Sequence, residues 1–141
     1  MKMKNNVLTL LLLLATSLTF GQTEEKHPID VQRENCHAED SNMTTVGMTN
    51  CELIAAELWD KQINDYFNSL LTLLEKEDIE ILKETQLKWI EYRDKELKFS
   101  GKFYGSLDGT MWRIQSAGRR CDINRTRALE LKNYIYALTG E

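Results

Sequence analysis

One predicted helix carries an amide and a guanidinium on its apolar side. Gln86, Trp89 and Arg93 recur at steps of three and four residues, in line with Leu82 and Leu97 on the same face. Such polar groups inside a small helical domain are costly unless they are hydrogen-bonded. Since an arginine offers five donors and always carries charge, the spacing predicts that Arg93 meets a carboxylate.

The predicted partners of Arg93 lie on the preceding helix. Glu57 and Asp60 supply carboxylates, and Asn64 supplies an amide from the same region. One interpretation makes these side chains a binding site. The interpretation that we favour makes them a structural polar network that fixes the register of the helices, formed by Gln86, Trp89, Arg93, Asp60 and Asn64.

The three cysteines can form at most one intrachain disulfide. Cys36 and Cys51 enclose 14 residues and are the predicted pair in an oxidising compartment. Closing a loop of that size would contribute about 3 kcal/mol by the chain-entropy estimate. Cys121 falls on the apolar stripe of a later helix, which favours a buried thiol over an exposed one that forms an intermolecular bridge.

The sequence lacks the motifs of the common hydrolases. It has no G-x-S-x-G, no H-E-x-x-H and no C-x-x-C, and His27 and His37 fall in a polar segment where we expect them to be solvated. Glu91 and Asp94, three residues apart, indicate a solvated acidic face rather than an acid–base pair. We therefore expect no enzymatic activity, no metal site and no cofactor.

Residues 1–21 have the composition of a secretory signal peptide. Lys2 and Lys4 precede an apolar run over residues 7–15, and cleavage is predicted after Gly21. The run is short for a transmembrane helix, so an uncleaved membrane anchor is the less favoured alternative. We expect the mature chain of 120 residues to be periplasmic or secreted and to have no membrane span.

The charge of the mature chain bears on its partners. Cleavage would remove two lysines and take the formal net charge from −4 to −6. A mildly acidic domain lacks the clustered basic face that nucleic-acid binding requires. Opposite net charge speeds the encounter with a basic protein, so we expect a protein partner.

The pattern after the signal peptide predicts an all-α fold, a three-helix antiparallel bundle with an irregular N-terminal arm. Residues 22–48 hold the only proline and a polar run, which indicates the arm, and residues 49–141 form the helical domain. Apolar steps of three and four residues predict three helices with a capping box at Thr49 and Glu52 and a second cap at Asp78. The helices run over about 50–75, 78–99 and 110–138, and the expected core residues include Trp59, Leu70, Trp89 and Ile114.

The central run of the second helix resembles a family signature. Residues 86–94 fit the pattern Q-x-x-W-x-x-Y-R-D of the lysozyme inhibitor LprI-like domain family. Residues 48–51 and 59–66 are similar to that family's M-x-x-C and W/L-D-x-x-L-N-x-x-Y stretches. The similarity continues at Cys36, at residues 109–111 and at Arg125, Thr126 and Leu129, so that it covers roughly residues 36–135.

This resemblance implies a small exported helical domain and suggests a function. Many members carry a cysteine shortly after the Y-R-D triplet, where this chain has Glu96 and Leu97. Cys121 then lacks its usual partner, which supports a buried free thiol. The family name implies a proteinaceous inhibitor of lysozyme-type muramidases; the alternative is an envelope interaction or immunity protein that binds another toxin or a structural partner.

Blocking a muramidase cleft requires a protruding segment, and residues 100–109 are the predicted loop that fits. Lysozymes carry paired carboxylates in a sugar-binding cleft. Lys102 or Ser106 could address those carboxylates, and Tyr104 could supply an amphipathic anchor of the kind found at interface hot spots. An ordinary connection between two helices is the competing interpretation. The predicted binding residues are Lys102, Tyr104 and Ser106.

Overall fold

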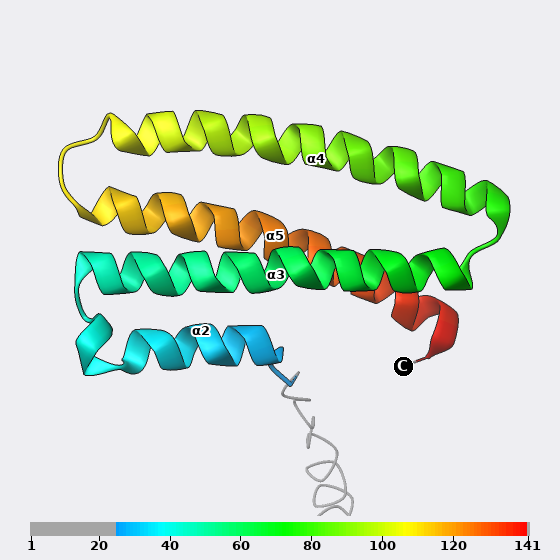
Figure 1. Cartoon of the computed structure of the whole chain (residues 1–141), viewed down its shortest axis with the longest axis horizontal. Helices are drawn as coiled ribbons and strands as arrows, with labels where there is room; N and C mark the ends of the chain where they lie inside the picture. Colours follow the sequence, from blue (N-terminus) through cyan, green and yellow to red (C-terminus); the bar gives the residue numbers. More distant parts are fainter. Residues whose placement is uncertain (1–24, 141) are drawn as a thin grey trace, which may run out of the picture.

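The computed structural model describes residues 25–140, and every regular element in this part is helical. The signal peptide predicted for residues 1–21 lies outside the described residues. Four α-helices and one short 3₁₀ helix follow one another along the chain (Figure 1). They are α2 (Pro28–Ala38), η1 (Asp40–Asn42), α3 (Thr45–Leu73), α4 (Lys76–Gly105) and α5 (Met111–Thr139).

The predicted irregular arm is wrong, because much of it is the helix α2. Pro28 stands at the first helical position, where its fixed φ favours the start of a helix and its missing N–H costs nothing. His27 caps the helix, with its Nδ1 accepting a hydrogen bond from the backbone N–H of Ile29 at 3.2 Å. The all-α class is confirmed, but the described chain has four helices where three were expected.

The helix α3 begins five residues earlier than predicted. Thr44 is its N-cap and accepts a hydrogen bond from the backbone N–H of Gly47 at 3.0 Å, so the capping box expected at Thr49 and Glu52 does not form. A Cβ at Gly47 would lie only 2.6 Å from the Cα of Asn42. Only glycine therefore allows the 3₁₀ helix η1 to pack against the first turn of α3.

The core lies mainly between α3 and α5, which run parallel and share the most extensive packing (Figure 1). The helix α2 covers α3 on one side, and α4 returns along α5 on the other. Trp59 and Leu70 are buried as predicted, together with Cys121 and Leu131, whereas Trp89 and Ile114 are only half-buried.

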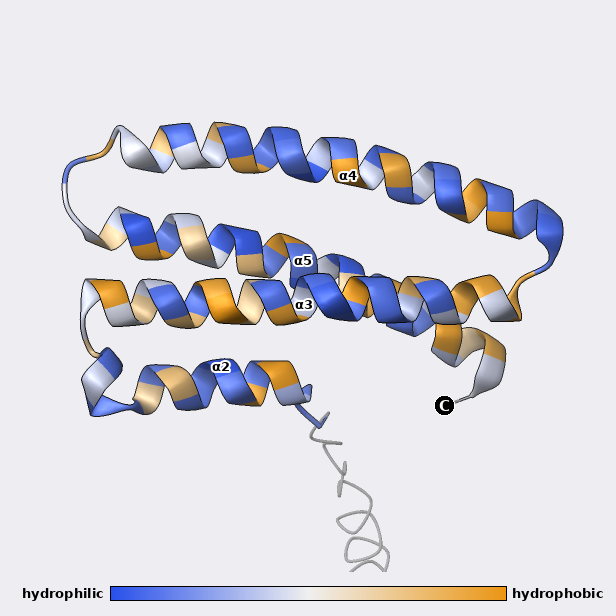
Figure 2. Ribbon diagram, in the orientation of Figure 1, coloured by the Kyte–Doolittle hydropathy of each residue, from blue (hydrophilic) through white to orange (hydrophobic). Residues whose placement is uncertain are grey.

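The helix α4 is the least embedded of the long helices. It packs on α5 but hardly touches α3, and only Leu82, Gln86 and Ser100 are buried among its 30 residues. Figure 2 accordingly shows mostly hydrophilic positions along α4, with scattered hydrophobic ones. Because α3 and α4 pack on α5 but not on each other, part of the surface of α5 between them is uncovered.

The loop predicted over residues 100–109 is wrong for its first six positions. The helix α4 continues through Gly101 to Gly105, and Asp78 lies in its first turn rather than at its cap, because the helix begins at Lys76. Glycines weaken a helix but do not end one whose neighbouring residues pack, and Ser100 is buried here. The actual connection to α5 is short and includes Gly109, whose φ of 103° suits glycine.

None of the helices within residues 25–140 combines the length and the apolar character needed to cross a membrane.

Candidate binding surface at the α4–α5 end

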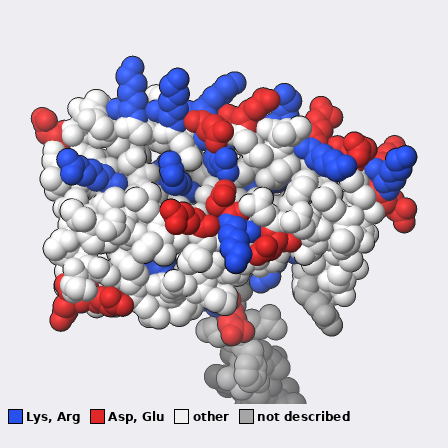
Figure 3. All heavy atoms as spheres, viewed as in Figure 1, with Lys and Arg blue, Asp and Glu red and all other residues white. Residues whose placement is uncertain are grey.

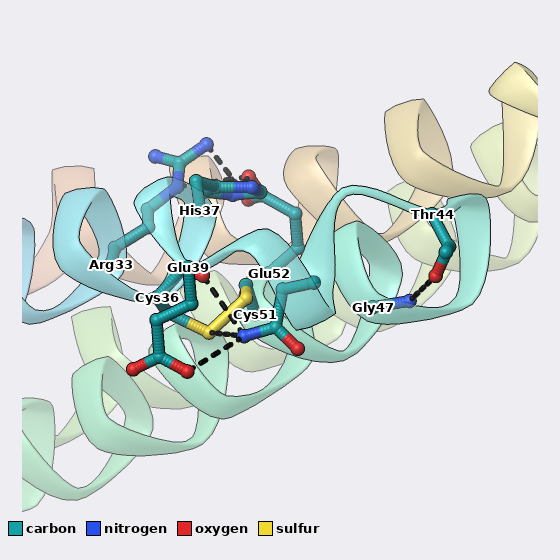
Figure 4. Close-up of a disulfide and its surroundings, with 9 residues drawn as sticks. Arg33, Cys36, His37, Glu39, Thr44, Gly47, Cys51 and Glu52 are labelled. Carbon is teal, nitrogen blue, oxygen red and sulfur yellow. Dashed lines mark hydrogen bonds and ion pairs between the residues drawn. A yellow bond between two sulfur atoms is a disulfide. The ribbon is translucent and has the colours of Figure 1, made fainter.

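The predicted disulfide Cys36–Cys51 is confirmed and joins α2 to α3 (Figure 4). The bond connects Cys36, near the C-terminal end of the short polar helix α2, to Cys51, a fully buried residue of α3. Cys121 is free and buried, as the apolar stripe predicted. The link fixes the C-terminal half of α2, which by itself is too short and too polar to be a stable helix.

A buried carboxylate lies beside this disulfide and was missed in the sequence. Glu52 has a side chain only 6% exposed, and Arg33 of α2 pairs with both of its oxygens, at 3.0 Å from Nε and 2.7 Å from Nη2. His37 contacts the same carboxylate at 2.8 Å, so the two basic side chains of α2 converge on one acid of α3 (Figure 4). The sequence did contain an indication that Glu52 is buried. Its position places it on the same helix face as Ala55 and Trp59, both of which are buried.

His27 and His37 are therefore not the solvated side chains that their polar segment predicted. The ring of His27 packs against that of Trp59, with centroids 4.3 Å apart and planes tilted by 37°, and it contacts the hydroxyl of Tyr66 at 3.3 Å. Burial lowers the pKa of His27, and nearby Lys132 acts in the same direction. Both histidines have structural roles in fastening α2. Within residues 25–140 no group of three or more His, Cys, Asp or Glu side chains is placed to hold a metal ion.

We predict that Cys121 resists alkylation in the native protein and reacts once the chain is unfolded. Burial raises the pKa of its thiol to about 11, so that only about a thousandth of it is thiolate at pH 8. The raised pKa also means that the free energy of unfolding falls as pH rises from about 9 to about 11, because the unfolded thiol ionises first. Intact mass after iodoacetamide treatment should show one label in urea and none without it. Native labelling as fast as that of a small thiol would contradict the prediction.

Part of the predicted polar network is present. Nη1 of Arg93 donates to Oδ1 of Asp60 at 3.0 Å, and Nε donates to the neighbouring Asp94 at 3.0 Å. The guanidinium also lies over the ring of Trp89, 5.1 Å from its centroid. Asn64 is exposed and donates to the backbone carbonyl of Asp60, so its amide does not reach Arg93.

Gln86 pairs with Arg127, a residue that the predicted network did not include. Nε of Arg127 on α5 donates to Oε1 of Gln86 at 2.9 Å, and both side chains are buried. The same guanidinium lies 5.9 Å from the ring of Trp89, on which Arg93 also packs. The network therefore joins α4 to α5 through Arg127. Arg127 lies four residues before Leu131, and this spacing could have placed Arg127 on the buried face of α5 from the sequence.

Replacing Arg93 by alanine is expected to cost about 1 kcal/mol of folding free energy. A loss of about 3 kcal/mol would follow only if a buried carboxylate were left without its partner. The side chain of Asp60 is 50% exposed and that of Arg93 is 21% exposed, so water can replace the guanidinium. Urea unfolding measures the loss, and Arg93→Lys separates the charge from the planar contact with Trp89. A loss above about 3 kcal/mol would show that Asp60 is not hydrated in the variant.

The predicted binding residues come together at one end of the molecule, at the C-terminal turns of α4 and the start of the connection. Lys102 is exposed on α4, and Tyr104 is half-buried. Ser106 follows the helix, and its hydroxyl donates to the carbonyl of Phe103 at 2.8 Å. That hydroxyl is engaged within its own helix end, whereas Lys102 remains available to a partner.

A row of four aromatic rings marks the same end and was not singled out in the sequence. The rings of Phe99 and Phe103 are 6.1 Å apart, those of Phe103 and Tyr104 5.5 Å, and those of Tyr104 and Trp112 5.9 Å. Phe99 is 65% exposed and Phe103 49% exposed. Exposed aromatic side chains that are held by ring contacts are typical anchors of protein interfaces.

Basic side chains accompany this aromatic row. Lys95, Lys98 and Lys102 are all exposed on the half of α4 that leads to the loop. Figure 3 shows Lys and Arg side chains spaced along the edge that α4 forms. An overall acidic chain thus presents a locally basic and aromatic end, which suits recognition of carboxylates.

These features define a small disulfide-linked helical domain with an exposed aromatic and basic end. The model of the family described as lysozyme inhibitor LprI matches residues 36–131. The chain therefore belongs to the LprI lysozyme inhibitor family, as its Q-x-x-W-x-x-Y-R-D run suggested.

Comparison with solved structures supports the fold. The chain is similar to a crystal structure of an uncharacterised protein from Burkholderia thailandensis, with a TM-score of 0.77 and 25% sequence identity. The match covers 82% of this chain and 57% of that one, so the chain spans little more than half the length of its structural relative. Comparison with curated proteins gives no significant match.

Proposed function

We propose that the protein is an exported inhibitor that binds a lysozyme-type muramidase and has no catalytic activity of its own. Membership of the LprI family over residues 36–131 is the observation that carries the proposal. The disulfide Cys36–Cys51 fits an oxidising compartment outside the cytoplasm. The expected net charge of −6 would speed the encounter with a basic enzyme.

The aromatic and basic end of α4 is the proposed contact surface. Phe99 and Phe103 offer exposed apolar area, and Tyr104 supports them by its edge contact with Phe103. Lys102 lies between the two phenylalanines in sequence and can reach toward the carboxylates of a muramidase cleft. Since Ser106 is bonded to its own helix, we assign it to shaping the tip rather than to direct contact.

A turbidity assay of bacterial cell walls tests this proposal. The mature protein should slow lysis by lysozyme, and Lys102→Ala combined with Phe103→Ala should weaken inhibition at least tenfold. The reason is that loss of an aromatic anchor at an interface commonly costs about 2 kcal/mol or more.

The matched control changes an exposed apolar residue and a lysine elsewhere on the same helix. Leu87→Ala combined with Lys88→Ala should leave inhibition unchanged, because both side chains lie about four turns from the tip. Equal inhibition by both double variants would move the contact surface elsewhere. Failure to inhibit several classes of lysozyme, with capture of a different purified envelope protein, would favour the immunity or envelope-interaction alternative.

A further inference from the structure

An open groove lies between α3 and α4, with α5 as its floor. We call it the α3–α4 groove. Its wide part, of about 840 Å³, is lined by Leu53 of α3, by Gly101, Tyr104 and Gly105 of α4, and by Trp112 and Arg113 of α5. A narrower part of about 310 Å³ continues toward Asn124, and Arg120 lines both. The groove exists because α4 packs on α5 but hardly touches α3.

The wide part combines stacked aromatic rings with two unpaired cations and one carboxylate, that of Asp108. The rings of Tyr104 and Trp112 are nearly parallel, at 16°, and 5.9 Å apart. Arg113 and Arg120 are exposed, and neither has a carboxylate partner within residues 25–140, unlike Arg33, Arg93, Arg119, Arg125 and Arg127. A free guanidinium favours planar two-point contact with a carboxylate.

The narrow part offers hydrogen-bond acceptors. Asn124 is only 4% exposed; its amide N–H donates to the carbonyl of Ala56 at 3.0 Å, and its Oδ1 has no partner in the described structure. Glu57, Asp60 and Asp94 line this part as well. Because Oδ1 of Asn124 is itself buried from solvent, the acceptors that a ligand meets here are the carboxylates.

Two helical glycines keep the groove clear. A Cβ on Gly101 or Gly105 would meet nothing within 4 Å, so packing does not require glycine at either position. Glycine inside a helix costs about 1 kcal/mol relative to alanine. Helix stability alone would therefore favour alanine at positions 101 and 105. Glycine at both positions instead leaves more room in the groove.

We propose that the α3–α4 groove binds a carboxylate-bearing polysaccharide strand. Its carboxylates would pair with Arg113 and Arg120, and its hydroxyl and amide groups would donate to Glu57, Asp60 and Asp94. A basic peptide would meet the two free arginines, and an acidic peptide would meet the three carboxylates of the narrow part. A sugar chain that carries both hydroxyls and carboxylates satisfies the two ends of the groove together.

The chemistry required is that of a muramic-acid-containing glycan strand, the kind that muramidases cleave, wherever its lactyl carboxyl groups carry no peptide. Binding to that strand would concentrate the protein where such an enzyme acts, which raises its effective concentration there. The proposal stands on the groove alone and does not require that lysozyme is inhibited.

Isothermal titration calorimetry with two soluble probes tests the proposal. One is a muramic-acid-containing oligosaccharide released from peptidoglycan, and the other is a neutral N-acetylglucosamine oligomer of equal length. Arg113→Gln combined with Arg120→Gln should weaken binding of the acidic oligosaccharide at least tenfold, and that of the neutral one less than threefold. The control Lys95→Gln with Lys98→Gln removes the same charge outside the groove and should preserve both affinities. Equal losses in the two double variants, or no binding by the wild type, would overturn the proposal.

A second variant separates the groove from stability. Gly101→Ala combined with Gly105→Ala should raise the melting temperature while it weakens binding of both oligosaccharides, because the new methyl groups enter the groove. Unchanged binding in this stabilised variant would also overturn the proposal. The Lys102→Ala, Phe103→Ala variant should bind the oligosaccharides normally, so failure of the glycan site and failure of lysozyme inhibition are distinguishable.

Discussion

Replacing Glu52 by alanine is expected to lower the free energy of unfolding by about 2–3 kcal/mol. The carboxylate is 6% exposed and accepts from both Arg33 and His37. Its removal leaves Arg33 with only Asp122, at 3.5 Å, and leaves His37 without an acid. The helix α2 then loses its polar attachment to α3, although the disulfide still holds it.

Urea unfolding of the oxidised protein measures this effect. Glu52→Gln keeps the shape and removes the charge, so it should cost less than alanine does. Glu34→Ala is the matched control, because Glu34 forms an exposed ion pair with Lys26 and should contribute less than about 0.5 kcal/mol. A loss below about 1 kcal/mol for Glu52→Ala would show that the cluster is not a fastening point for α2.

Trp59→Ala is the second large expected effect, at about 3–5 kcal/mol. Its side chain is fully buried at the centre of α3, where it packs beneath the ring of His27 and 5.9 Å from the guanidinium of Arg125. Arg125 in turn pairs with Asp30 of α2 at 2.8 Å. Truncation would leave a cavity and would loosen the N-terminal end of α2, which the disulfide does not reach.

Chemical unfolding and amide hydrogen exchange test this expectation together. Trp59→Phe should cost only about 1–2 kcal/mol, because it keeps a ring and removes an indole N–H that has no partner in the described structure. Exchange at Ile29 should accelerate more than exchange at Cys36, which the disulfide holds. Ile81→Ala, on an exposed position of α4, is the control and should cost less than about 0.5 kcal/mol. Equal costs for Trp59→Ala and the control would contradict the central role of Trp59.

Helix type and the disulfide could be predicted because they depend on local pattern and on counting. Apolar steps of three and four residues marked α3, α4 and α5, since 3.6 residues per turn bring those positions to one face. Three cysteines, one of them on an apolar stripe, left Cys36 and Cys51 as the pair that the structure confirms. The Q-x-x-W-x-x-Y-R-D run at residues 86–94 gave the family in the same way.

The helix α2 could not be predicted because its stability comes from other elements. Its sequence is short and polar, with Ile29 as its one buried residue. The disulfide, the Glu52 cluster and the packing of His27 on Trp59 hold it, and each of these needs α3 in place. Local composition therefore indicated an irregular arm where tertiary contacts support a helix.

The sequence by itself determined the helical class, the cysteine pairing and the family, because each follows from residue spacing along one chain segment. Only the tertiary structure decided that Gln86 meets Arg127, and that the turns around Lys102 and Tyr104 are helical. It also decided that α3 and α4 stay apart over α5. Partner choice and open space depend on how helices are placed relative to one another, and the periodicity of a single helix carries no information about that placement.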